Sequence, residues 1–140
     1  MTVSALLLPV FVQVGLTFFL MFWMGILRRR ALSSGAVKPS DIALRQPNWP
    51  PRTLQVANCF HNQLELPMLF YVVCIALYVT LGVDAYALAL AWLYFALRVG
   101  HSLVHLTYNN VYHRLGVYAA SGIVLALLWV RFAAALFRGG

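Results

Sequence analysis

The sequence has few charged residues and very few acidic ones. Only 9% of its 140 residues are charged, and three Asp and Glu stand against ten Lys and Arg, which gives a formal net charge of +7. Hydrophobic residues make up 63% of the chain, and its mean hydropathy is +0.82. This composition excludes an ordinary water-soluble domain, and the aromatic and aliphatic content excludes a disordered chain. The composition indicates an integral membrane protein.

The scarcity of cysteine and of acidic residues also excludes several kinds of site. The two cysteines, Cys59 and Cys74, both fall in one apolar segment, so we expect packing residues and no disulfide. Glu65 is the only carboxylate inside the apolar segments, which leaves a Ser-His-Asp triad without a candidate. His101 and His105 have i, i+4 spacing but lack a second ligand pair such as Glu-x-x-His, so no metal site is predicted.

Four apolar segments approach or exceed the roughly 20 helical residues that cross a bilayer. They run over about residues 5–27, 53–81, 85–108 and 115–137. The first is uncharged and is followed by three arginines, the reverse of a signal peptide, so we expect a retained helix. The short turn at 82–84 makes the second and third segments an antiparallel hairpin. The sequence thus predicts an all-α integral membrane protein, with one four-helix domain over residues 1–140.

The distribution of basic residues predicts an orientation and a class of partner. The polar segment over about residues 28–52 carries six Lys and Arg, whereas the opposite face has two, both near the C-terminus. By the positive-inside rule this loop is cytoplasmic and both termini lie on the other side. Because the basic residues lie beside apolar runs, we expect anionic lipid headgroups or an anionic substrate as partners, and no nucleic acid.

Two trios of polar residues interrupt the second and third apolar segments. Each trio has the spacing of one helical face, and the six residues are Asn58, Asn62 and Glu65 on the second segment and Arg98, His101 and His105 on the third. In an antiparallel hairpin, two residues at equal depth have numbers with a constant sum. That sum is 163 for each of the facing pairs, which are Glu65 with Arg98, Asn62 with His101, and Asn58 with His105. Half of this value falls at the predicted turn, so the two faces should meet in three polar layers.

Glu65 and Arg98 form the deepest of these layers, roughly 15 Å from the cytoplasmic ends of their helices. A lone charge there is costly, so we expect a charge-assisted ion pair that fixes the register of the hairpin. For Asn62 and His101, a ligand-binding role and an interhelical hydrogen bond are equally compatible with the sequence. Pro67 lies inside the second segment and should bend it, freeing a carbonyl group.

Two motifs together resemble one family of membrane proteins. The run Asn62-Gln63-Leu64-Glu65-Leu66-Pro67 and the pattern Arg98-x-x-His101, followed by His105-Leu-Thr-Tyr-Asn-Asn-Val-Tyr-His-Arg114, are similar to the membrane-associated proteins in eicosanoid and glutathione metabolism (MAPEG), in a bacterial-type variant. The resemblance extends over nearly the whole chain. It implies a homotrimer of four-helix subunits, in a bacterial inner membrane, that bind glutathione between adjacent subunits near the cytoplasmic side.

The resemblance also implies roles for single residues. Arg114 would be the catalytic residue, whose guanidinium stabilises the glutathione thiolate. Asn62, Glu65, His101 and Tyr118 would hold the cofactor, and a lipophilic small molecule would reach the thiolate from the lipid phase. The implied function is that of a glutathione-dependent transferase or peroxidase.

The chain departs from the characterised eukaryotic enzymes of this family at four positions. Asn58 and His61 match arginines that bind the glutathione carboxylates, His105 matches a tyrosine, and Leu115 matches a serine. Two other hypotheses therefore stay open. One is a non-catalytic relative that binds lipid or serves as an accessory subunit of a membrane complex. The other is a proton or ion pathway through Glu65, Arg98 and the histidines.

Overall fold

A computed structural model describes residues 2–139, which leaves the two ends of the expected 1–140 domain, Met1 and Gly140, outside the described residues. Within this range all the regular secondary structure is helical, and no strand is present. The helices are η1 (Val3–Leu6), α1 (Leu7–Ser33), η2 (Pro39–Asp41), α2 (Pro51–Asn62), α3 (Leu66–Val79), α4 (Ala85–Leu106) and α5 (Val111–Arg138). Four segments are long and apolar enough to span a membrane: η1 with α1, α2 with α3, α4, and α5.

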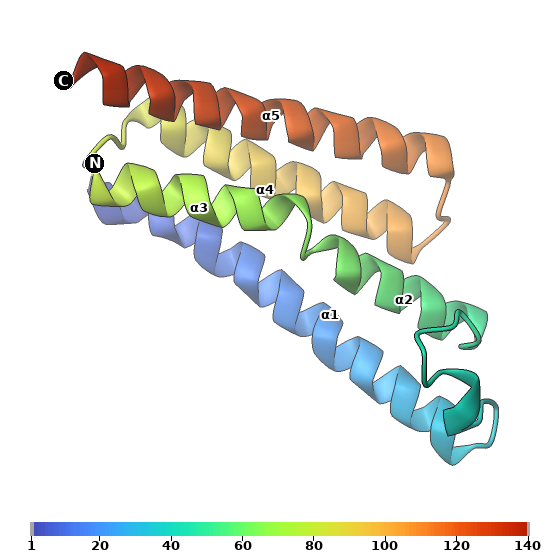
Figure 1. The fold of residues 1–140 in the computed structure, drawn as a ribbon. Helices are drawn as coiled ribbons and strands as arrows, with labels where there is room; N and C mark the ends of the chain where they lie inside the picture. Colours follow the sequence, from blue (N-terminus) through green and yellow to red (C-terminus); the bar gives the residue numbers. More distant parts are fainter. Residues whose placement is uncertain (1, 140) are drawn as a thin grey trace.

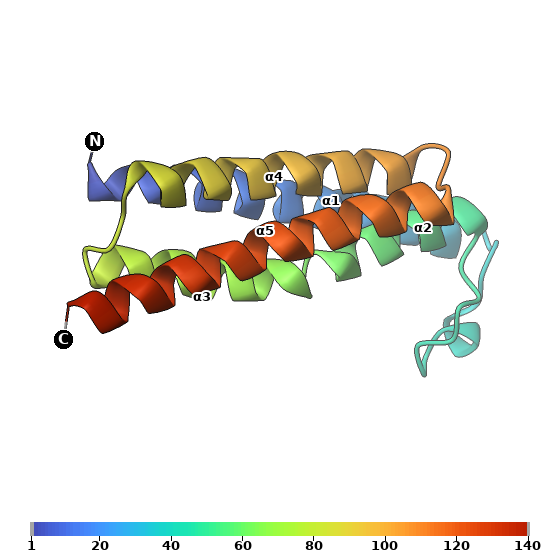
Figure 2. The ribbon, with the colours of Figure 1, turned by 90° about the horizontal axis from the view of Figure 1, so that it is seen from above.

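The four spans form a two-layered bundle. Helix α4 lies with α1 in one layer, and α5 lies with α2 and α3 in the other (Figures 1 and 2). Helices α4 and α5 make the most extensive contact, whereas α3 packs mainly on α1 and α5. Both chain ends and the α3–α4 turn lie at one end of the bundle, opposite the long loop and the α4–α5 turn (Figure 1).

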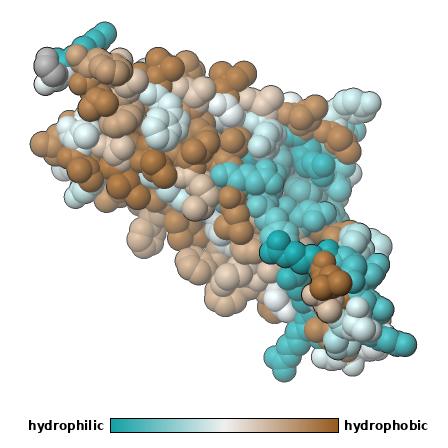
Figure 3. Space-filling view, viewed as in Figure 1, coloured by the Kyte–Doolittle hydropathy of each residue, from teal (hydrophilic) through white to brown (hydrophobic). Residues whose placement is uncertain are grey.

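Side-chain packing in the centre of the bundle is mainly apolar and aromatic. Phe70 of α3 and Tyr94 of α4 stack across the core with ring centroids 4.4 Å apart, which is a favourable offset arrangement. Large apolar side chains on the outer faces are exposed, among them Phe11 at 78% and Ile123 at 64%. Figure 3 shows this apolar surface over the half of the bundle that holds the chain ends, with hydrophilic residues between α2 and α5 and over the long loop. The outer apolar faces therefore suit contact with lipid.

The second span is interrupted where the sequence predicts one bent helix over residues 53–81. Helix α2 ends at Asn62, α3 begins at Leu66, and Glu65 has φ −96° and ψ −106°. Pro67 has no N–H to donate to the carbonyl of Gln63, so the α-helical pattern cannot continue through this point. Instead, the N–H groups of residues 63, 64 and 65 each donate to the carbonyl three residues earlier. The helix is thus broken, and α3 starts in a new rotational phase.

Gln63, within this break, joins three helices through its side chain. Its Oε1 accepts a hydrogen bond from Nε2 of Gln13 in α1 at 3.0 Å. Its Nε2 donates to Oγ of Ser102 in α4 at 3.2 Å and to the carbonyl of Cys59 in α2 at 3.2 Å. Gln13 and Gln63 are fully buried. Buried amides that find each other in this way hold helices in register, and neither belongs to the predicted polar faces.

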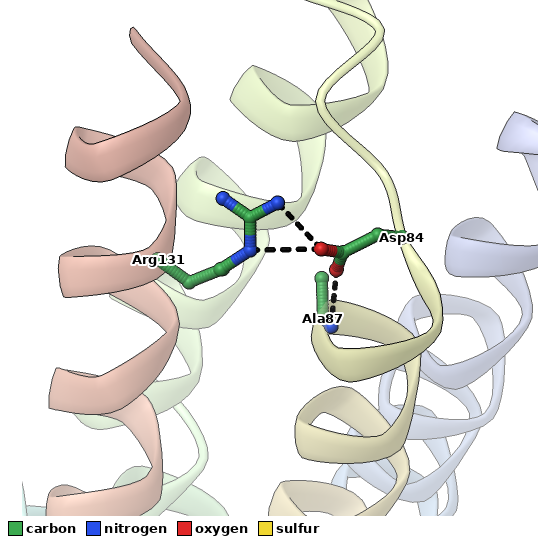
Figure 4. Close-up of polar contacts among 3 residues, drawn as sticks. All are labelled: Asp84, Ala87 and Arg131. Atoms are coloured by element: carbon green, nitrogen blue, oxygen red, sulfur yellow. Dashed lines mark hydrogen bonds and ion pairs between the residues drawn. The ribbon is translucent and has the colours of Figure 1, made fainter. Parts of the chain in front are cut away.

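At the other end of the bundle, Asp84 begins α4 and connects it to α5 (Figure 4). Its Oδ1 accepts the N–H of Ala87 at 2.8 Å, and its Oδ2 accepts from Nε and Nη2 of Arg131 at 2.9 and 2.5 Å. Partial burial raises the pKa of Asp84, but the hydrogen bond from Ala87 and the Arg131 guanidinium outweigh it and hold this pKa below its ordinary value. The carboxylate is thus both a helix cap and one half of an ion pair.

These two roles of Asp84 can be separated by substitution. Asp84→Asn keeps a good N-cap and loses the ion pair, so it should lower the free energy of unfolding by about 0.2–1 kcal/mol. Asp84→Ala removes both contacts and should cost about 1 kcal/mol more. The measurement is thermal unfolding in detergent at pH 7. The pKa of Asp84 is lower in the folded than in the unfolded state. The extra free energy of unfolding of the wild type relative to Asp84→Asn should therefore be complete at pH values above the unfolded-state pKa. It should disappear as the pH falls through the folded-state pKa. An advantage that persists at lower pH would contradict this assignment.

Candidate functional site

A pocket of about 200 Å³ opens between the end of α2, the last third of α4 and the beginning of α5. We call it the site pocket. It contains all five residues for which the sequence resemblance implies catalysis or cofactor binding, together with two apolar side chains, and its lining is Asn62, Glu65, His101, Val111, Arg114, Leu115 and Tyr118. These residues come from three segments that are distant in sequence. The structure therefore brings the expected site residues together, while their chemical roles stay predictions.

The α4–α5 turn places Arg114 at this pocket. Asn109 takes the left-handed conformation (φ 50°) just beyond α4, a conformation that asparagine tolerates better than most residues. Asn110 then caps α5, because its Oδ1 accepts the N–H groups of Tyr112 and His113 at 3.0 and 3.1 Å. Nη1 of Arg114 donates to Oδ1 of Asn109 at 2.7 Å. This single contact orients the guanidinium and leaves most of its five donors for other acceptors.

Arg98 lies behind the site pocket and is fully buried. Its Nη2 donates to both the carbonyl oxygen and Oδ1 of Asn62, the former at 3.3 Å. Within residues 2–139 no ion pair joins Arg98 to Glu65, and Arg131–Asp84 is the ion pair that is present. The expected structural pair Glu65–Arg98 is therefore corrected to Asn62–Arg98. The physical reason is the break after Asn62, which leaves Glu65 exposed at the rim of the site pocket.

One aromatic ring and two imidazole rings lie in tilted and edge-on contact beside this guanidinium. The ring centroid of Tyr118 lies 5.9 Å from Cζ of Arg98 and 5.8 Å from the ring of His101, which in turn lies 5.7 Å from the ring of His105. In the described part of the chain, five buried polar atoms here have no hydrogen-bond partner: Nε and Nη1 of Arg98, Nδ1 of His101, Nδ1 of His105 and the hydroxyl of Tyr94. Each such atom is free to bond to water, a ligand or another polar group, because an unsatisfied buried polar group is costly.

The observed pairs between the second and third spans test the predicted register. Asn62 contacts Arg98, and the Gln63 side chain contacts Ser102, with residue numbers that sum to 160 and 165 against the predicted 163. A third contact, from Nε2 of Gln55 to the carbonyl of His105 at 2.7 Å, also sums to 160. The antiparallel register is thus close to that expected, although it is built from different side chains.

The remaining predicted residues lie elsewhere. Asn58 and His61 line a separate pocket below the long loop, so the expected layer of Asn58 with His105 does not form. Cys59 and Cys74 are buried and unpaired. Across residues 2–139, no group of three His, Cys, Asp or Glu side chains lies close enough to hold a metal ion. Two residues missed by the sequence analysis, Gln13 and Ser102, carried no signal beyond being isolated polar residues in apolar helices.

Taken together, the four apolar spans and the pocket between them define a helical integral membrane protein with a partly polar pocket in its hydrophilic half. The sequence profile of the MAPEG family matches residues 6–134, which is nearly the whole chain. The chain therefore belongs to the MAPEG family. Comparison with curated proteins and with solved structures gave no significant match.

The contact between Asn62 and Arg98 leads to a test of the buried charge. Asn62→Asp would place a carboxylate against the guanidinium and should raise the apparent melting temperature in detergent. Asn62→Leu removes an acceptor from a buried cation and should lower the free energy of unfolding by about 1–3 kcal/mol. Equal destabilisation by Asn62→Asp and Asn62→Leu would refute the role given to Arg98.

Proposed function

We propose that the protein is a membrane-bound glutathione-dependent transferase or peroxidase that acts on a lipophilic substrate. The observation that carries this proposal is the site pocket, in which Asn62, Glu65, His101, Arg114 and Tyr118 meet in a member of the MAPEG family. Glutathione supplies a thiol as nucleophile or reductant, on a tripeptide that also bears an ammonium and two carboxylates. A pocket for it needs both signs of charge and hydrogen-bond donors.

The residues present fit such a ligand. Glu65 is exposed at the pocket rim and has no ion-pair partner within residues 2–139, so its carboxylate is available to an ammonium group. Arg114 offers guanidinium donors beside the pocket, and a nearby guanidinium favours a thiolate over a thiol. Asn62, His101 and Tyr118 add neutral hydrogen-bonding groups that can orient the peptide.

The apolar part of the same pocket suits the second substrate. Val111 and Leu115, on the outward side of α5, are exposed and line the pocket beside Arg114. A hydrophobic compound dissolved in the bilayer can thus approach the position where the thiolate would lie. The chain's part in the reaction is to hold the sulfur beside Arg114, to stabilise its negative charge, and to keep the lipophilic acceptor in contact with it.

The size of the pocket favours an oligomer. Its volume of about 200 Å³ is below the range of roughly 300–1,000 Å³ that is usual for small-molecule sites. The partnerless polar atoms behind it also lack acceptors within the subunit. Both observations support a site completed by an adjacent subunit, and a homotrimer is the assembly that the family resemblance implies. We further propose a bacterial inner membrane location, with the basic loop cytoplasmic and both termini on the opposite side.

Purified protein in a neutral detergent tests this function directly. Glutathione binding is measured by calorimetry, thiolate formation by ultraviolet difference spectra as a function of pH, and activity with 1-chloro-2,4-dinitrobenzene. Arg114→Ala should reduce turnover by about 100-fold, as expected on loss of a donor that stabilises developing negative charge. It should also shift thiolate formation to higher pH, because the positive charge that lowers the thiol pKa is removed.

The matched control is Arg138→Ala, an exposed arginine in the last turn of α5, far from the pocket, which should leave binding and turnover unchanged. Glu65→Gln should weaken glutathione binding. The pH dependence of thiolate formation by the bound glutathione should not change. Absence of saturable binding at millimolar glutathione would refute the proposal. Unchanged assembly of Arg114→Ala together with no activity in the wild type would favour the non-catalytic, lipid-binding or accessory alternative.

A further inference from the structure

A second pocket, here called the loop pocket, is lined by residues of α1, the long loop and α2. The long loop lies at the end of the bundle opposite the chain ends (Figure 1). Its volume is about 400 Å³, within the usual range of ligand sites. It is formed by the end of α1, the loop that follows η2, and one face of α2, and its lining is Arg28, Ile42, Arg45, Gln46, Pro47, Trp49, Leu54, Ala57, Asn58 and His61. None of these residues lines the site pocket, so the two pockets are separate in the subunit.

The charge of the loop pocket is of one sign. Arg28 and Arg45 line it, His61 adds an imidazole, and no carboxylate is present in the lining. The nearest acidic residue in the sequence, Asp41, is outside the lining, and its Oδ2 accepts the backbone N–H of Lys38 at 3.1 Å. Two guanidinium groups therefore face a cavity without a counter-charge from the protein. This arrangement favours an anionic ligand.

The guanidinium of Arg28 lies against the Trp49 ring at this pocket. Its Cζ lies 5.0 Å from the centroid of the Trp49 ring, which is within the range of a cation–π contact. Its Nε is buried and has no hydrogen-bond partner within residues 2–139. This guanidinium N–H has no acceptor within the described part of the chain and is therefore available to a ligand oxygen. The planar donor fork of arginine matches the oxygens of a phosphate group.

Part of the wall of the loop pocket is apolar. Ile42, Pro47, Leu54 and Ala57 line it together with the Trp49 ring. The pocket also lies beside the end of the first membrane span, where Arg28 begins a run of three arginines. Tryptophan and arginine at such a position are typical of the level of lipid headgroups. A phosphate ester that carries a glycerol or acyl portion would place its phosphate beside the guanidinium groups and its other portion beside the apolar side chains.

We propose that the loop pocket binds a phosphate oxyanion, carried by an anionic lipid headgroup or by a small soluble phosphate, between Arg28 and Arg45. The proposal does not depend on the glutathione function, because it uses other residues. Glutathione serves as a separate probe in the test, since Asn58 and His61 match family positions that contact its carboxylates.

The experiment uses delipidated full-length protein in a neutral detergent. Binding of dioctanoyl phosphatidic acid, of dioctanoylglycerol and of inorganic phosphate is followed by native mass spectrometry and by thermal shift. The two lipids differ only in the phosphate group, so phosphatidic acid should bind and raise the melting temperature whereas dioctanoylglycerol should not. Weak binding of inorganic phosphate identifies a lipid as the source, and binding as tight as that of phosphatidic acid identifies a soluble phosphate.

The variant Arg28→Gln/Arg45→Gln should weaken phosphatidic acid binding by about tenfold or more, as expected for the loss of charge-assisted contacts. Arg29→Gln/Arg30→Gln removes the same charge from two exposed neighbours outside the loop pocket and should retain binding. Arg45→Gln alone, on an exposed loop residue, provides the test if the double variant does not fold. Equal loss in both double variants, equal binding of dioctanoylglycerol, or displacement of phosphatidic acid by glutathione would overturn the proposal.

Discussion

A buried guanidinium without a carboxylate is the constraint on which the polar half of the bundle depends. Arg98 is fully buried, and the acceptors that it reaches are the carbonyl and Oδ1 of Asn62. That carbonyl is available because the helix stops there: the N–H of Glu65 approaches it at 3.3 Å in a tight turn, and the α-helical bond from Leu66 is not made. The break at Pro67 and the burial of Arg98 are thus two parts of one arrangement, since a continuous helix would offer the cation fewer acceptors.

The same break determines the charge distribution of the site pocket. With Arg98 satisfied in part by neutral groups, Glu65 is released from the interior and lies exposed at the pocket rim. Arg114 approaches from α5, so the pocket contains a carboxylate and a guanidinium that do not neutralise each other within the subunit. Separated charges of opposite sign suit a zwitterionic ligand better than a purely apolar one. The pocket's polarity therefore follows from the backbone geometry of three residues in the middle of the second span.

The sequence predicts the large-scale structure well and the polar contacts less well. Hydropathy alone is enough to find the four spans, because about 20 apolar residues in a row have few other uses. The constant-sum argument gives nearly the right depth for Arg98, but it assumes an unbroken helix, and Pro67 changes the phase of every residue before it relative to α3. Gln13 and Gln63 could not be paired in advance, since a lone amide in an apolar helix does not indicate which neighbour it meets.

Helix α2 is the common wall of the two pockets. Asn62 at its end faces the site pocket, whereas Asn58 and His61 face the loop pocket. Its beginning is attached to the end of α4, because Arg52 donates to the carbonyl of Leu106 and Gln55 donates to that of His105. Its other end is separated from α3 by the break, so α2 is fixed to α4 more directly than to the rest of its own span. Helix α2 therefore holds the Asn62 acceptors of Arg98 at one end and supplies part of the loop pocket's wall along one face, so the position of this one short helix fixes both.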